Sequence, residues 1–144
     1  MKKILFLGAA TFQTPPIHYA ISRGYKVITA DNQPKNSGHL LAHRSYNTST
    51  TDIEAILTIC QNEKVDGIVS YGSDVSALTA AYVCEKLHLP SNSLASVELL
   101  CNKAKFRHFL QQNELQLQLF ESFDEHNKPA LKNYIQQKWL HTNQ

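Results

Sequence analysis

The fold is decided by the stretch KKILFLGAATFQTPP at Lys2–Pro16 and the segment YKVITAD at Tyr25–Asp31 that follows it. The apolar run ILFL ends at Gly8, which predicts a strand buried on both faces and followed by a tight turn. The two prolines suit the first turn of a helix, where a missing N–H is tolerated. The second apolar run, VITA, predicts another buried strand. Together they predict a right-handed β-α-β unit in a parallel sheet, with ligands at the edge that holds Gly8 and Asp31.

Length and composition indicate one domain that can bury a real core. Of the 144 residues, 42% are hydrophobic, and no apolar run approaches the ~20 residues that a membrane span needs. The net charge of +2 comes from scattered residues, so the chain lacks the basic patch typical of nucleic-acid binding. We expect a cytoplasmic protein that binds neither membrane nor nucleic acid. Three widely spaced cysteines, Cys60, Cys84 and Cys101, favour reduced thiols over a disulfide framework.

Apolar patterns after Asp31 predict more strands and helices, which makes the chain an α/β protein with a sheet of four to five strands. The expected strands are Arg44–Tyr46, Val65–Val69 and a short edge strand at Leu87–Pro90, where proline is tolerated. A capping box at Thr51–Glu54 predicts a helix start with the threonine hydroxyl as the cap. Further helices are expected at His39–Ala42, Val75–Leu87 and Ser93–Leu100, and from Lys103 onward.

The pattern loosens from Glu114, so we place a domain at residues 1–113 and a linker with a terminal helix at residues 114–144. Residues 115–119 alternate apolar and polar side chains like a half-buried strand. A turn at Asn127–Pro129 predicts a final helix, Ala130–Leu140.

Known catalytic and cofactor motifs are weak in this sequence. The turn after the first strand has only the first glycine of the dinucleotide-binding pattern Gly-x-Gly-x-x-Gly, which argues against a nicotinamide cofactor. His39 and His43 have the spacing of two metal ligands on a helix but lack an acidic or cysteine partner, so packing roles are favoured. No serine or cysteine lies in a nucleophile motif. We therefore predict no catalytic residue and no metal ligand.

A polar rim follows three of the predicted strands and is the candidate ligand site. Its backbone N–H groups, amide, hydroxyls and two carboxylates could hold a small polar or amino-bearing ligand. The alternative, that Asp31 and Asp74 only cap turns, remains open. The predicted substrate-binding residues are Gly8, Ala9, Thr11, Gln13, Asp31, Asn32, Tyr71, Gly72, Ser73 and Asp74.

Several segments, in order from Lys2 to about Phe120, together resemble the amino-terminal part of ATP-grasp carboxylate-amine ligases. These enzymes are relatives of carbamoyl phosphate synthetase large chains and biotin carboxylase. The resemblance implies a pre-ATP-grasp domain, a Rossmann-like parallel sheet ordered 3-2-1-4-5 with helices on both faces. The segments are KKILFLGAATFQTPP, DNQP at Asp31–Pro34, STTD at Ser49–Asp52, DGIVSYGSD at Asp66–Asp74, LPSN at Leu89–Asn92 and NKAKFR at Asn102–Arg107.

The same resemblance implies how such a domain works. It packs against catalytic lobes, in cis or in trans, and supplies part of the pocket for a small carboxylate or amine. Lys103 falls where the family places a basic residue that reaches the nucleotide; a solvated lysine is the alternative. ATP and Mg²⁺ serve the parent family, but the lid and metal-binding segments that hold them are missing here. We therefore expect no cofactor and no catalysis for this chain alone.

Two other functions remain open at this point. One is a stand-alone binding module for a small molecule or nucleotide. The other is an interaction domain, including a possible homodimer, because apolar residues normally covered by missing lobes would seek a partner. Residues proposed for such a surface are Leu115, Leu117, Leu119 and Trp139.

Overall fold

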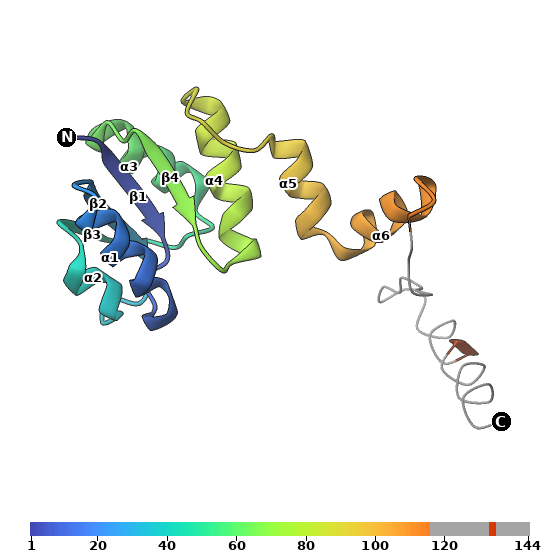
Figure 1. Ribbon diagram of the computed structural model, residues 1–144, viewed down its shortest axis with the longest axis horizontal. Helices are drawn as coiled ribbons and strands as arrows, with labels where there is room; N and C mark the ends of the chain where they lie inside the picture. Colours follow the sequence, from blue (N-terminus) through green and yellow to red (C-terminus); the bar gives the residue numbers. More distant parts are fainter. Residues whose placement is uncertain (116–132, 135–144) are drawn as a thin grey trace. The chain divides into compact units, whose positions relative to one another are not determined.

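Four parallel strands form the centre of the structure, a computed structural model that describes residues 1–115 and 133–134. Their order across the sheet is β3-β2-β1-β4 (Figure 1). Leu5 on β1 pairs in register with Ile28 on β2 and with Ile68 on β4. The predicted α/β class and the order 3-2-1-4 are thus confirmed. The strands are β1 (Lys3–Leu7), β2 (Lys26–Asp31), β3 (Arg44–Asn47) and β4 (Gly67–Ser70).

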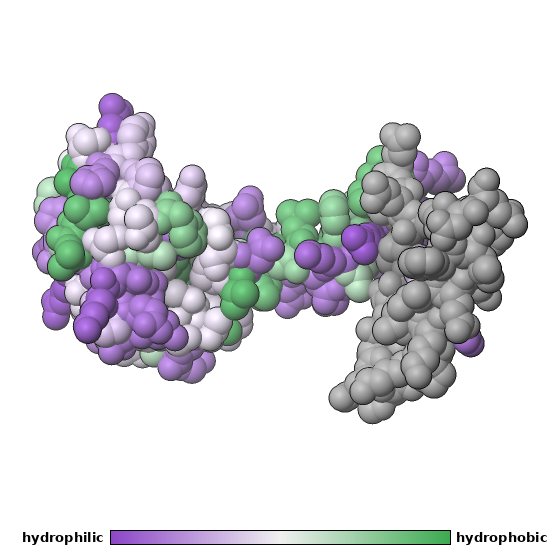
Figure 2. All heavy atoms as spheres, turned by 90° about the horizontal axis from the view of Figure 1, so that it is seen from below, coloured by the Kyte–Doolittle hydropathy of each residue, from purple (hydrophilic) through white to green (hydrophobic). Residues whose placement is uncertain are grey.

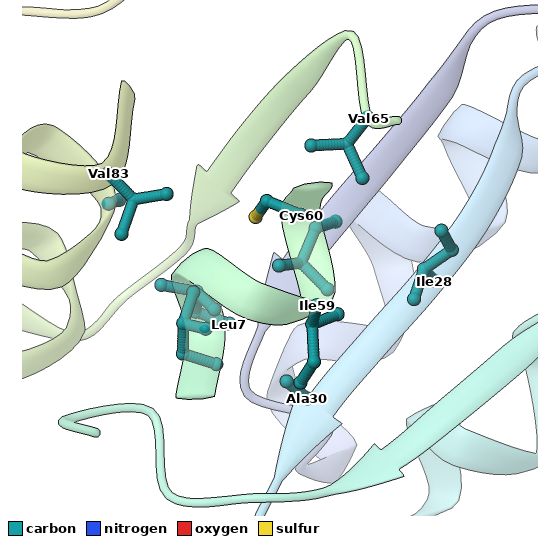
Figure 3. Packing of buried hydrophobic residues seen from close by; sticks show 10 residues of the cluster. Leu7, Ile28, Ala30, Ile59, Cys60, Val65 and Val83 are labelled. Carbon is teal, nitrogen blue, oxygen red and sulfur yellow. The ribbon is translucent and has the colours of Figure 1, made fainter. Parts of the chain in front are cut away.

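Helices connect the strands and cover both faces of the sheet. On one face α3 and α4 bury a cluster that includes Leu7, Ile28 and Val83 (Figure 3). On the other face Ile17 and Ala20 of α1 pack against β1 and β2. The helices are η1 (Thr11–Gln13), α1 (Thr14–Ser22), α2 (Ser37–Leu41), α3 (Ile53–Glu63), α4 (Asp74–Lys86), α5 (Leu94–Cys101) and α6 (Lys103–Gln112).

The chain divides into two compact units, Met1–Asn102 and Lys103–Gln144. The predicted change of domain after residue 113 stays a prediction. Leu115 is not in a strand, and the rest of the predicted strand at 116–119 and the helix Ala130–Leu140 lie outside the described residues, except that residues 133–134 are helical. Among the described residues, no helix is long and apolar enough to cross a membrane.

The predicted fifth strand at Leu87–Pro90 is wrong. His88 has a φ of 53°, a left-handed conformation that a strand does not use. The Leu89 N–H donates to the Cys84 carbonyl at 2.8 Å, so it closes the end of α4 rather than pairing with β4. Among the described residues, the sheet therefore ends at β4. Its order is 3-2-1-4 instead of the predicted 3-2-1-4-5.

The three cysteines are free thiols, as predicted. Burial raises the pKa of the Cys60 thiol to about 12. Burial also raises the pKa of Cys84, although hydrogen bonds from the Ser91 side chain and the Ile68 backbone act in the opposite direction. These contacts place the segment after α4 beside the outer strand without pairing it.

Asp52, and not Thr51, caps the start of α3. The Asp52 carboxylate accepts from the Ala55 N–H at 3.1 Å, while the Thr51 hydroxyl is hydrogen-bonded to the Ser49 hydroxyl at 2.9 Å. The N-cap is therefore one residue later than predicted, because aspartate is at least as good a cap as threonine. The predicted capping box does not form, since the third residue of the helix is Ala55 and not a glutamate.

A buried carboxylate fastens α3 to the amino-terminal edge of the sheet. Glu63 is 5% exposed, and its Oε1 accepts from Arg44 at 2.8 Å and from the Tyr46 hydroxyl at 2.6 Å. Lys3 Nζ donates to the Glu63 carbonyl at 2.6 Å and lies 3.6 Å from Oε2. The Tyr46 hydrogen bond, followed by the charges of Arg44 and Lys3, lowers the pKa of Glu63 against the effect of burial.

Glu63→Gln is expected to lower the free energy of unfolding at pH 7 by about 2 kcal/mol, less than is typical for a buried pair because Arg44 is largely exposed. Because the folded-state pKa is lowered, this stabilisation is present above the unfolded pKa and is lost as the pH falls through the folded value. Urea unfolding measured between pH 7 and pH 3 checks this. An equal acid dependence in wild type and variant would contradict it.

Candidate functional site

The carboxyl ends of the four strands meet at one edge of the sheet, and a cavity of about 230 Å³ lies there. Parallel strands bring their carboxyl ends to the same edge, which is where open α/β sheets bind ligands. The cavity is lined by Leu7, Gly8, Ala10, Phe12, Gln13, Asp31, Asn32, Thr50, Ser73 and Ser76.

The turn after β1 is held by the side chain of Gln13. Its amide oxygen accepts from the Ala10 N–H at 3.0 Å, and its amide nitrogen donates to the carbonyls of Leu7 at 3.3 Å and Tyr71 at 3.0 Å. Gly8 has a φ of 103°, and a Cβ at this position would overlap the Gln13 amide. Only glycine fits here, and Gln13 ties the end of β1 to the end of β4.

Asp31 connects the same turn to the loop after β2. The carboxylate is 9% exposed and accepts from the Ala9 N–H at 2.8 Å, the Gln33 N–H at 2.8 Å and the Asn36 amide at 3.0 Å. Three backbone and side-chain donors therefore converge on one buried carboxylate. The turn-capping interpretation of Asp31 describes most of what this side chain does.

A second close approach fixes α2 against the turn. The Gly38 N–H donates to the Ala9 carbonyl at 2.7 Å, and a Cβ on Gly38 would lie 2.7 Å from that oxygen. Glycine at this position lets the start of α2 approach the turn after β1, and the hydrogen bond joins the two segments.

Serine hydroxyls order the loop between β4 and α4. Ser73 caps α4 by accepting from the Ser76 N–H at 3.4 Å. The Ser70 hydroxyl contacts the Ser76 hydroxyl at 2.7 Å and donates to the Ser73 carbonyl at 3.0 Å. The helix begins at Asp74, directly after its N-cap Ser73.

The segments that line the cavity also carry exposed apolar side chains. Phe12, Tyr71 and Val75 are 57%, 48% and 63% exposed, and the Phe12 ring lies against Gly72, where an added Cβ would be 3.1 Å from it. Figure 2 looks from below, the side toward which the β1 and β4 arrows of Figure 1 point, and shows hydrophobic residues among hydrophilic ones there. The edge thus combines a polar cavity with an apolar rim.

The structure brings half of the predicted substrate-binding residues to the cavity. Its lining includes Gly8, Gln13, Asp31, Asn32 and Ser73. The predicted residues Ala9, Thr11, Tyr71, Gly72 and Asp74 are outside that lining although they belong to the same turn and loop. Lys103 is exposed at the start of α6 in the second unit. The roles of all these residues toward a ligand stay predictions.

Sequence reasoning missed Thr50, which lines the cavity from the segment after β3. The signal was present, because the third parallel strand ends at the same edge as the others. Ser76 was also missed, and Phe12, although it lies in the rim segment Gly8–Gln13 that the sequence indicated, was not among the predicted binding residues. Both residues reach the cavity only because η1 and the first turn of α4 lie close together in the fold. The spacing of residues along the chain does not predict this proximity.

The histidine pair packs against β2. His43 Nδ1 accepts from the Val27 N–H at 3.1 Å, and His39 Nδ1 is 2.8 Å from the Thr29 hydroxyl. Within residues 1–115 and 133–134, no three His, Cys, Asp or Glu side chains gather in a way that could hold a metal ion.

A larger cavity of about 310 Å³ lies between β4, α4 and the segment Pro90–Asn92. No charged side chain lines it, and its floor includes three alanines, Ala77, Ala80 and Ala81. The carboxyl edge remains the better candidate site, because buried polar groups from three loops converge there.

A parallel sheet with helices on both faces defines a Rossmann-like α/β fold, and its polar cavity lies at the carboxyl edge, where such folds bind ligands. No family model matches the chain. A formate-dependent phosphoribosylglycinamide formyltransferase from Methanocella arvoryzae is 33% identical over 67 residues, which are 46% of this chain and 16% of that protein. The chain therefore spans a small part of this curated relative.

Solved structures share the fold over most of the chain. N5-carboxyaminoimidazole synthetase from Staphylococcus aureus, in complex with ADP, has a TM-score of 0.76 and 21% identity over 94% of this chain and 35% of its own. Phosphoribosylglycinamide synthetase from Anaerococcus prevotii has a TM-score of 0.74 and 20% identity over 92% and 34%. These neighbours are ATP-grasp enzymes, and this chain corresponds to their N-terminal part. The predicted resemblance to that part is confirmed at the level of the fold.

Proposed function

We propose that the chain is the substrate-side domain of an ATP-dependent carboxylate-amine ligase and is catalytically silent alone. The observation that carries this proposal is the ligand-sized cavity at the carboxyl edge of a fold shared with about a third of each ligase compared. The turn held by Gln13 and the loop held by Asp31 would give one wall of the substrate pocket. The remaining walls would come from an ATP-grasp domain, in cis or in trans.

The chemistry of the cavity supports separate sites for the substrate, on this domain, and for the nucleotide, on a partner domain. None of its ten lining residues is lysine or arginine, whereas phosphoryl transfer relies on cations that neutralise developing charge. ATP and Mg²⁺ would therefore be held by the partner domain. Lys103, at the start of α6, is proposed to contact the nucleotide as a point charge, with the helix N-terminus beside it.

The apolar rim favours a protein partner at this edge. Phe12, Tyr71 and Val75 expose large apolar side chains beside the cavity, a feature of surfaces that are covered in an assembly. A catalytic lobe would cover them while completing the pocket. Self-association is the competing outcome, and light scattering over a concentration range distinguishes a monomer from a dimer.

Phosphate release from ATP by the 144-residue chain, with mixed amines and carboxylates, is expected to stay at the level of the buffer blank. A chimera in which residues 1–112 replace the matching part of the Staphylococcus aureus synthetase is expected to hydrolyse ATP with an altered substrate preference. The unmodified synthetase is the control. Robust turnover by the chain alone would contradict the proposal, as would a folded chimera that keeps the control's substrate preference.

A further inference from the structure

The cavity at the carboxyl edge has a defined sign of charge. Among its ten lining residues Asp31 is the single one with an ionisable carboxylate, and no lysine, arginine or histidine is present. Because Asp31 is 9% exposed, its charge is screened less than a surface charge would be. The side chains of the cavity therefore contribute one negative charge and no positive charge.

The hydrogen bonds of Asp31 leave room for one more donor. A carboxylate offers about four acceptor positions. Oδ2 accepts from the Ala9 N–H and from the Asn36 amide, and Oδ1 accepts from the Gln33 N–H. The remaining acceptor position is on Oδ1, and Asp31 lines the cavity.

The other walls suit the same kind of ligand. The Thr50 and Ser73 hydroxyls supply oxygen acceptors, and Phe12 supplies an aromatic ring, a group that can bind a cation. A volume of about 230 Å³ admits a molecule of amino-acid size. The Asp31 carboxylate would repel a phosphate, and the lining has no cationic side chain to offset this repulsion. Phosphate binding is therefore disfavoured.

We propose that this cavity selects the primary ammonium group of a small, unphosphorylated molecule. The ammonium donates to Asp31 Oδ1 and to a hydroxyl of Thr50 or Ser73, and it lies against the Phe12 ring. This inference rests on the proposed function, because it assigns a substrate class to the same site. It adds that the part of the substrate held here carries no phosphate.

Titration of the full chain with three probes, followed by amide chemical shifts in NMR spectra, tests the assignment. L-Alaninamide has the ammonium, N-acetyl-L-alaninamide has the same body without it, and inorganic phosphate is the anion. L-Alaninamide is expected to shift the amides of Gly8, Asn32 and Ser73 and to bind at least about tenfold more tightly than the other two probes. Equal binding of the first two probes, preference for phosphate, or no shift at about 50 mM ligand overturns the proposal.

A variant that neutralises the side-chain charge of the cavity provides the matched test. Asn32 is exposed at the cavity, so Asn32→Lys is expected to leave the fold intact, weaken L-alaninamide about tenfold and create phosphate binding. Asn62→Lys adds the same charge to an exposed position of α3 and is expected to change neither affinity. Unchanged probe preference in Asn32→Lys contradicts the proposal. Ammonium-selective binding together with an inactive chimera would refute the proposed ligase function but not the ammonium selectivity of the cavity.

Discussion

Replacing Gly8 by alanine is expected to lower the free energy of unfolding by at least about 3 kcal/mol. Two costs combine. A side chain at a φ of 103° is strained, and the added Cβ displaces the Gln13 amide, which breaks its hydrogen bonds to Leu7 and Tyr71. Urea unfolding followed by circular dichroism measures the loss. Because the cavity wall is built on this turn, ligand shifts at the carboxyl edge are expected to disappear as well.

Two other glycines provide controls that separate these costs. Gly24 has a φ of 80° but no atom near its Cβ position, so Gly24→Ala is expected to cost only about 1 kcal/mol of backbone strain. Gly67 has neither a positive φ nor a neighbour in that space, and Gly67→Ala is expected to be close to neutral. A loss in Gly8→Ala no larger than that in Gly24→Ala would show that Gln13 does not hold the turn.

Asp31→Asn is expected to lower the free energy of unfolding by about 3 kcal/mol and to abolish binding of L-alaninamide. The variant keeps the size of the side chain but replaces one acceptor oxygen by an NH₂ group. That group faces N–H donors of Ala9, Gln33 or Asn36, and a buried donor left without an acceptor is costly. Thermal unfolding and the NMR titration give the two readouts.

Asp52→Asn is the matched control, because it makes the same chemical change at a helix cap. Asp52 accepts a single hydrogen bond, from Ala55, and asparagine caps helices about as well as aspartate. Its stability is expected to change by less than about 0.5 kcal/mol. Equal stability losses in the two variants would show that Asp31 is an ordinary turn residue.

The sequence predicted the fold well where burial on both faces leaves a continuous apolar run. The runs before Gly8 and Asp31 gave β1 and β2 with the right direction and neighbours, since a β-α-β crossover has one preferred hand. The helix expected at Val75–Leu87 forms as α4 at Asp74–Lys86, and its small residues Ala80 and Ala81 are buried. The error at Leu87–Pro90 arose because the alternating sequence Leu-His-Leu-Pro fits a helix-terminating turn as well as an edge strand.

The candidate site was predictable in its location but not in its chemistry. The predicted strand ends showed which edge of the sheet would hold the site. The composition of the loops at that edge indicated Gln13 and Asp31 as binding residues. Whether these polar groups face a ligand or their own backbone depends on distances between loops far apart in sequence, such as Gln13 to Tyr71. No local pattern reports such distances. The fourth acceptor position on Asp31 could be counted only after its other three donors were known.

The direction of β1 has a practical consequence for experiments that need this protein on a solid support. Met1 is exposed, and β1 begins two residues later at the edge opposite the cavity. Five residues of strand separate the two edges, a span of about 15 Å. An affinity tag or a biotin tether at Met1 would thus attach the molecule through the edge of the sheet opposite the cavity and leave the cavity open to the solution.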